Sequence, residues 1–124
     1  MKLDVDLIKM VATTKQFEHL PLLLADDVQL KNPAGWMPIQ GKEAVRAALI
    51  EVLSIIKPMH YERIWENGNE YALEFVGKVG DKDVKGIDLM TINDEGKIIC
   101  IEVLIRPIAA LMAIRETLLA KRNG

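Results

Sequence analysis

The fold is decided by residues 71–106, which read YALEFVGKVGDKDVKGIDLMTINDEGKIICIEVLIR. Two short polar turns, at residues 80–83 and 93–96, divide this stretch into three segments rich in β-branched and apolar residues. Such segments favour strands, and turns this short join neighbouring antiparallel strands. With a further strand at residues 61–66 and a turn at residues 67–69, the sequence predicts a four-stranded antiparallel meander.

Helical patterns lie on both sides of the meander. Residues 41–56 place their apolar side chains on one helical face, and Pro58 follows the end of this pattern. We also expect a helix over residues 3–14, a short helix starting near His19, a strand over residues 28–31 and a closing helix over residues 108–121. Helices segregated from an antiparallel sheet define the α+β class, and 124 residues without a linker or repeat form a single domain, residues 1–124.

Composition excludes several classes of protein. The chain has 16 Lys and Arg against 18 Asp and Glu, which is not the basic excess of a nucleic-acid-binding protein. Half of the residues are hydrophobic, so a disordered chain is excluded. The longest apolar runs are too short to cross a bilayer, and no signal peptide precedes Asp4, so we expect a soluble cytoplasmic protein without a membrane segment.

Metal and cofactor sites are not indicated by the sequence. A single cysteine, Cys100, can form neither an internal disulfide nor a multi-cysteine zinc site. The two histidines, His19 and His60, are far apart in the chain and lack a neighbouring carboxylate motif. We therefore predict no metal and no cofactor.

The strand at residues 97–106 carries information about partners. Ile101, Val103 and Ile105 line one face, while Cys100 and Leu104 line the other, so the strand lacks the polar face of a half-solvated strand. The helices of so short a chain can cover one face of the sheet. The other face either meets a second copy of the chain or is covered by the closing helix.

Four blocks of sequence carry a family resemblance. They are LADDVQLKNPAG at residues 24–35, GKEAVR at 41–46, GIDL at 86–89 and NDEGKII at 93–99. In this order they resemble the ketosteroid isomerase and SnoaL-like polyketide cyclase branch of the nuclear-transport-factor-two-like superfamily. The resemblance implies a cone-shaped, cystatin-like fold: a curved antiparallel sheet wraps around the N-terminal helices and encloses an apolar pocket.

The resemblance leaves the activity open, because this scaffold serves isomerases, cyclases, hydrolases and non-enzymatic adaptors. It implies binding of a small hydrophobic molecule, either for isomerase-, cyclase- or hydrolase-type catalysis or for recognition alone. It also implies a homodimer through the outer face of the sheet. The alternative function is a non-catalytic dimerisation or adaptor domain whose cone is filled by side chains.

Asp88 is the first candidate for the site. It matches the family's protonated aspartic acid, which donates a hydrogen bond to the substrate oxygen. Period-two alternation puts Asp88 on the same face as Met90 and Ile92, and burial there would disfavour its charged form. The alternative is a structural carboxylate paired with a neighbouring strand.

Two other positions depart from the isomerase pattern. The family's catalytic base precedes a proline, and here that position holds Asn32, which cannot accept a proton at useful pH. The tyrosine of the first helix is also missing. Ordinary ketosteroid isomerisation is therefore not expected, unless another base has taken over. His60, at the start of a strand, alternates with Glu62 and Ile64 and is the best such candidate, because a histidine side chain can exchange a proton near neutral pH. The alternative is a solvated residue at the end of the strand.

Apolar side chains complete the predicted site. Strand alternation and the loop at residues 36–38, which would lie over the open end of the cone, select the predicted ligand-binding residues. They are Asn32, Trp36, Met37, Tyr71, Leu73, Phe75, Met90, Ile101, Val103 and Ile105. Glu62 and Glu74 alternate with apolar residues on their strands, and we expect both to face outward as solvated charges.

Overall fold

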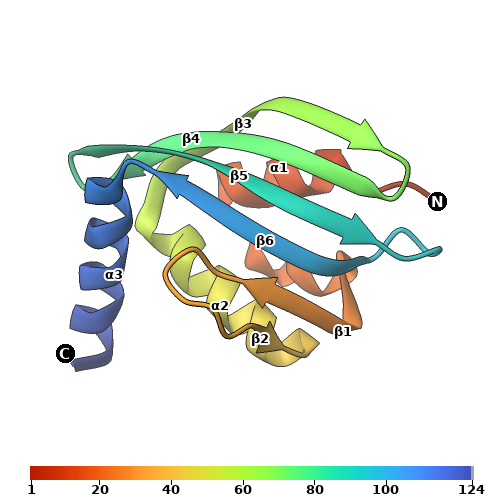
Figure 1. Ribbon diagram of the computed structural model, residues 1–124, viewed down its shortest axis with the longest axis horizontal. Coiled ribbons are helices and arrows are strands. Elements are labelled where there is room, and N and C mark those ends of the chain that lie inside the picture. The colour runs from red at the N-terminus through yellow and green to blue at the C-terminus, as the bar shows by residue number, and fades with distance from the viewer. Residues whose placement is uncertain (124) are drawn as a thin grey trace.

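A six-stranded, curved sheet forms the frame of the protein (Figure 1). The computed structural model describes residues 1–123. The sheet has the order β2-β1-β6-β5-β4-β3, and its strands are β1 (Leu24–Lys31), β2 (Ile39–Gln40), β3 (Ile56–Asn67), β4 (Glu70–Val79), β5 (Lys82–Ile92) and β6 (Ile98–Arg106). Strands β3 to β6 are each antiparallel to the next, which confirms the predicted meander.

Three details of the sheet differ from the prediction. Strand β1 pairs parallel to β6, since the two are far apart in the chain and no short turn joins them. Strand β2 was not predicted, because two residues are too few to display an alternating pattern. Strand β3 begins at Ile56 and contains Pro58, which an edge strand tolerates because it leaves backbone donors unpaired on its free side.

Two helices and a 3-10 turn lie on the inner face of the sheet. They are α1 (Val5–Thr14), the 3-10 helix η1 (Phe17–Leu22) and α2 (Lys42–Ile55). The carboxylate of Asp4 accepts a hydrogen bond of 3.1 Å from the backbone N–H of Leu7, so α1 begins at Val5. Figure 1 shows α1 and α2 on one side of the curved sheet, as the apolar face of residues 41–56 predicts.

The closing helix α3 (Ile108–Asn123) packs at one end of the sheet (Figure 1). Its buried residues Ala110 and Ile114 join a core cluster with Phe75 and Val84, whose side chains point to the inner side. Helix α3 therefore closes an end of the inner layer and leaves the outer face of β5 and β6 uncovered. Among the described residues, none of the helices has the length and apolar character needed to cross a membrane.

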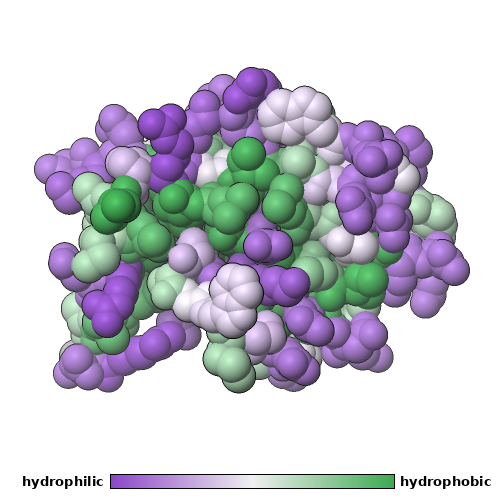
Figure 2. Space-filling model, viewed as in Figure 1, coloured by the Kyte–Doolittle hydropathy of each residue, from purple (hydrophilic) through white to green (hydrophobic). Residues whose placement is uncertain are grey.

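The outer face carries exposed apolar side chains over β5 and β6. Leu89 is 39% exposed and Leu104 is 50% exposed. Figure 2 shows hydrophobic residues gathered over the middle of this face, with hydrophilic residues around them. The inner face, in contrast, is almost completely buried, so the two faces of one sheet have very different environments.

Candidate functional site

A cavity of about 80 Å³ lies between the helices and the inner face of the sheet. Side chains from α1, η1, α2 and strands β1 and β3 to β6 form its walls. Nearly all of them are aliphatic, aromatic or thioether groups. Asp88 and Tyr61 are the two lining residues that carry a hydrogen-bonding side-chain group. The cavity is thus apolar with one polar point, which is the polarity typical of small-molecule sites, and its volume is below the range of about 300–1,000 Å³ that is usual for them.

Asp88 reaches this cavity because strand alternation directs it inward. It lies in the middle of β5, opposite Leu73 of β4 and Val103 of β6. The residue is only 7% exposed, and it shares the inner face with the buried Met90 and Ile92. A carboxyl group in this position has lost most of its hydration, so its protonation depends on the groups that remain close to it.

Tyr61 is the partner of Asp88. Its hydroxyl donates a hydrogen bond of 2.7 Å to Oδ2 of Asp88. The Tyr61 ring meets Phe75 edge to face, with the ring centroids 6.3 Å apart. The alternation of β3 could have revealed Tyr61, because Tyr61 follows the buried Met59 by two residues and therefore faces the same side of the sheet. Simple alternation predicts the opposite phase, with His60 directed inward, because it does not include the irregularity between Tyr61 and Ile64.

Glycine at position 86 makes room for this arrangement. Gly86 lies opposite Phe75 on the neighbouring strand. A methyl group at Gly86 would overlap the Phe75 ring and the backbone carbonyl of Leu104. The missing side chain therefore lets Phe75 lie against β5 and support the Tyr61 ring beside Asp88.

The electrostatics of the pair follow from burial. Burial raises the pKa of Asp88 to about 6, and the hydrogen bond from Tyr61 offsets part of this rise. Burial also raises the pKa of Tyr61 well above 10, and the adjacent Asp88 raises it further. Tyr61 is therefore a neutral donor at physiological pH, while Asp88 exchanges its proton close to neutrality.

One oxygen of Asp88 is available to a ligand. Among residues 1–123, only Oδ2 has a hydrogen-bond partner, which is the Tyr61 hydroxyl. No fully enclosed side-chain oxygen or nitrogen in this part of the chain lacks a partner, so Oδ1 retains some accessible surface, and Asp88 lines the cavity. When protonated, Asp88 can donate a hydrogen bond to a carbonyl oxygen, and when ionised it can accept one or remove a proton.

Most of the predicted lining residues of the meander surround this cavity. Phe75, Met90, Ile101, Val103 and Ile105 all line it. Tyr71 and Leu73 are buried in the core but do not line it.

Tyr71 has a structural role in that core. Its hydroxyl accepts a hydrogen bond of 3.2 Å from the backbone N–H of Leu3 and contacts Glu66 at 3.3 Å. These bonds tie the start of the chain to β3 and β4.

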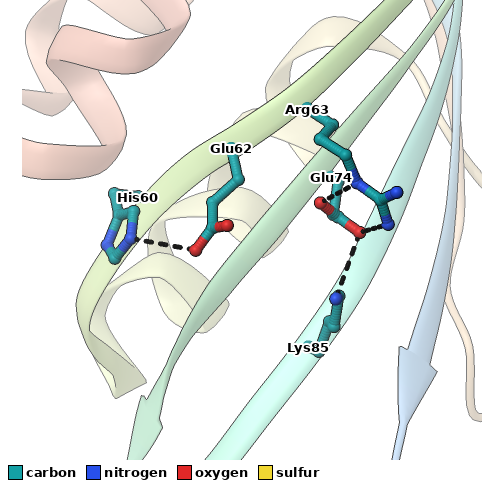
Figure 3. A network of polar contacts seen from close by, with 5 residues as sticks. All are labelled: His60, Glu62, Arg63, Glu74 and Lys85. Carbon is teal, nitrogen blue, oxygen red and sulfur yellow. Dashed lines mark hydrogen bonds and ion pairs between the residues drawn. The ribbon is translucent and has the colours of Figure 1, made fainter.

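His60 does not reach the cavity. Its side chain is 60% exposed and lies 3.5 Å from Glu62 on the outer face of β3, as Figure 3 shows. An irregularity in the pairing of β3 with β4, between Tyr61 and Ile64, changes the phase of the strand. Simple alternation joined His60 to the inward Ile64, and this interpretation is wrong.

Trp36 and Met37 do not line the cavity either. They are 97% and 81% exposed in the loop between β1 and β2, and both point into solvent. Asn32, at the end of β1, lines a separate, neighbouring cavity. Asp88 and Asn32, which were both predicted for one site, therefore line two different cavities.

The outer face holds a second buried carboxylate, Glu74 (Figure 3). The residue is only 2% exposed, which corrects the expectation of a solvated charge. Arg63 donates a hydrogen bond of 2.7 Å to Oε1 and a second, shorter one to Oε2, while Lys85 lies 3.2 Å from Oε2. The hydrogen bonds from Arg63, with help from Lys85, lower the pKa of Glu74 to about 2.

Histidine and carboxylate side chains do not assemble into a metal centre in the described part of the chain. Within residues 1–123, no group of three or more His, Cys, Asp or Glu side chains is placed to hold a metal ion. The chemistry available to the Asp88 cavity from the chain itself is hydrogen bonding and proton transfer.

A family model describes most of this chain. Residues 7–101 match the SnoaL-like domain, and the protein belongs to that family. The match covers α1, α2 and all six strands at least in part, including Asp88 and Tyr61. No curated protein matches the chain significantly.

Solved structures agree with this assignment. An uncharacterised protein with a cystatin-like fold from Silicibacter pomeroyi is 32% identical over 94% of this chain and 83% of its own, with a TM-score of 0.89. A steroid delta-isomerase from Pseudomonas aeruginosa is 28% identical over 97% of this chain and 91% of its own, with a TM-score of 0.86. A Catenulispora acidiphila protein with a ketosteroid isomerase-like fold, 16% identical over 91% and 92% of the two chains at a TM-score of 0.69, shares the fold.

Proposed function

We propose that the protein binds a small apolar molecule carrying one carbonyl or hydroxyl group, and that Asp88 and Tyr61 hold this polar group. The observation that carries the proposal is the open oxygen of Asp88 in an otherwise apolar cavity. A buried carboxyl without a second partner is costly to the fold, and a ligand that supplies the partner recovers part of that cost.

The same geometry supports proton transfer to or from the ligand. The pKa of Asp88, about 6, lies near the pH at which a general acid or base is most effective. Similarity to a steroid delta-isomerase is consistent with chemistry at a carbonyl-bearing apolar substrate. The proposed class is therefore an isomerase-, cyclase- or hydrolase-type site, with Asp88 as the group that exchanges the proton.

A matched pair of probes tests the binding proposal. p-Cresol and p-xylene have nearly the same shape, and p-cresol alone can hydrogen-bond to Asp88. Isothermal titration calorimetry should show roughly tenfold or greater preference for p-cresol, because a hydrogen bond to a charged or strongly polar buried group is worth about 1.5–3 kcal/mol. Asp88→Ala should abolish the preference, and the outer-face control Glu62→Gln should keep it. Equal binding of the two probes to the wild type, or a preference that survives in Asp88→Ala, would contradict the proposal.

A second proposal concerns assembly: the chain forms a homodimer through the outer face of the sheet. The exposed Leu89 and Leu104 and the hydrophobic surface over β5 and β6 favour it (Figure 2). Leu104→Asp should convert a dimer to a monomer in light scattering. Leu22→Asp is a matched control, because Leu22 is 57% exposed but lies in η1. A wild type that stays monomeric at high concentration would exclude the dimer and leave the Asp88 site unaffected.

A further inference from the structure

A second, larger cavity adjoins the Asp88 cavity. It has a volume of about 290 Å³ and lies between α2, α3, β6 and the loop that follows β1. Its walls are largely apolar, and its polar side chains are Asn32, Arg115 and Arg122. This volume approaches the lower end of the range of about 300–1,000 Å³ that is usual for small-molecule sites.

The two cavities share part of their walls. Leu49, Val52, Val103 and Ile105 line both of them. Leu49 and Val52 are one turn apart on α2, and Val103 and Ile105 are alternate inward residues of β6. The cavities therefore lie on opposite sides of one thin partition of aliphatic side chains. All four residues that line both cavities are aliphatic.

Two arginines on α3 give the second cavity a positive charge. Arg115 and Arg122 are two turns apart on α3 and line the same cavity. Arg122 already contacts Glu51 at 3.5 Å, whereas Arg115 makes no ion pair within residues 1–123. The guanidinium of Arg115 is thus available to an anionic group, and arginine binds carboxylates with two parallel hydrogen bonds.

We propose that the two cavities are halves of one elongated site for an apolar carboxylic acid with a hydroxyl or carbonyl group at its other end. The carboxylate binds Arg115, the hydrocarbon chain passes the aliphatic partition, and the uncharged polar group binds Asp88 and Tyr61. The assignment of the uncharged polar group to Asp88 and Tyr61 rests on the proposed function. The opposite orientation is unfavourable, since it would bring the ligand carboxylate against the buried carboxyl of Asp88.

Calorimetry with 12-hydroxydodecanoate below its micelle concentration tests the elongated site. The uncharged comparison is its methyl ester, and the comparison without the hydroxyl group is dodecanoate. The wild type should bind the hydroxy acid roughly tenfold more tightly than either comparison, with one molecule bound per chain. Arg115→Gln should remove the advantage over the ester and leave ester affinity unchanged. Arg46→Gln, on α2 outside both cavities, is the matched control and should bind as the wild type does.

A blocking variant separates the two cavities. Leu111 lines the second cavity and not the first, so Leu111→Trp should abolish binding of the hydroxy acid while p-cresol still binds. Retained p-cresol binding also shows that this variant is folded.

The outcomes separate the two proposals. Equal affinities for acid and ester, no effect of Arg115→Gln, or undiminished hydroxy acid binding in Leu111→Trp would each overturn the elongated site. The p-cresol result at Asp88 would stand in all three cases. If p-cresol itself shows no dependence on Asp88, the proposed function fails, whatever the arginine variants show.

Discussion

Two carboxylates on opposite faces of the same sheet differ in the direction of their pKa shifts. Asp88 on β5 points inward and is 7% exposed, while Glu74 on β4 points outward and is 2% exposed. Burial raises the pKa of Asp88 to about 6. Two cations lower the pKa of Glu74 to about 2. Exposure alone would have predicted similar behaviour for the two groups.

The difference lies in their neighbours. Glu74 has Arg63 and Lys85 in contact, so its charge is neutralised and remains fixed over the physiological range. Asp88 has a neutral phenol and aliphatic side chains, which leave its charged form poorly compensated. The outer carboxylate is therefore held as a fixed charge, while the inner one keeps a free oxygen and an exchangeable proton, which the proposed function requires.

The largest effect that we predict concerns catalysis on the inner face. The ketosteroid isomerases that this sequence resembles carry their base at the position of Asn32. Loss of a general base costs about 10²–10⁴-fold in rate. Turnover of a β,γ-unsaturated ketosteroid, followed by absorbance of the conjugated product, should therefore be low in the wild type. Asn32→Asp should increase it only modestly, because Asn32 lines the neighbouring cavity, and the control Asn67→Asp, at the end of β3, should not increase it. Rapid turnover by the wild type would show that Asp88 or another group replaces the missing base.

The next effect concerns stability and pH. Because the pKa of Asp88 rises from 3.8 in the unfolded chain to about 6 in the fold, the protonated form is favoured by folding. The free energy of unfolding should fall as pH rises from about 4 through 6. Asp88→Asn should lack this fall and be more stable than the wild type at pH 8 by up to about 3 kcal/mol, at 1.36 kcal/mol per pKa unit. Urea unfolding at several pH values measures this. A wild type that gains stability between pH 4 and 7 relative to Asp88→Asn would contradict the inner-face account.

A smaller effect is expected at Gly86. Gly86→Ala would push a methyl group against the Phe75 ring. Overpacking of this kind costs about 1–3 kcal/mol, which urea unfolding detects. Gly35→Ala is the control, since a methyl group there meets nothing within 4 Å. The displaced ring should also weaken p-cresol binding, because Phe75 supports Tyr61. A variant as stable as the control would show that Phe75 repositions freely.

The smallest effect belongs to the outer face. Glu74 stabilises the fold above its ordinary pKa of 4.5, and this contribution is lost as pH falls toward about 2. In Arg63→Gln the acid-side loss of stability should be shallower, because Lys85 alone remains beside the carboxylate. Thermal unfolding between pH 5 and 2.5 compares the two proteins. Parallel curves would mean that Arg63 does not lower the pKa of Glu74.

The regular parts of the fold were predictable from the sequence. Turn residues and alternation gave the meander of β3 to β6, and the apolar stripe of residues 41–56 gave α2 on the inner face. Asp88 could be directed inward because β5 pairs with β4 in an unbroken register through Leu73 and Asp88. Alternation is reliable where the register is continuous.

The remainder depended on interruptions and on distant contacts. The irregularity after Tyr61 reversed the phase of β3, so sequence reasoning chose His60 and missed Tyr61. The burial of Glu74 results from cations on two neighbouring strands, which a single strand pattern cannot reveal. The separation of Asn32 from Asp88 depends on how α2 and α3 divide the space between them.

The titration of the Asp88 carboxyl carbon by NMR tests the central claim most directly. The account predicts a midpoint near pH 6 in the wild type, and an upward displacement in Tyr61→Phe, because the phenol hydrogen bond lowers the pKa of Asp88. Saturation with p-cresol should move the midpoint, since the ligand contacts the open oxygen. The Glu74 carboxyl, titrating far lower in the same sample, is the internal reference. A midpoint near 4 for Asp88, unchanged by Tyr61→Phe and by p-cresol, would contradict the account.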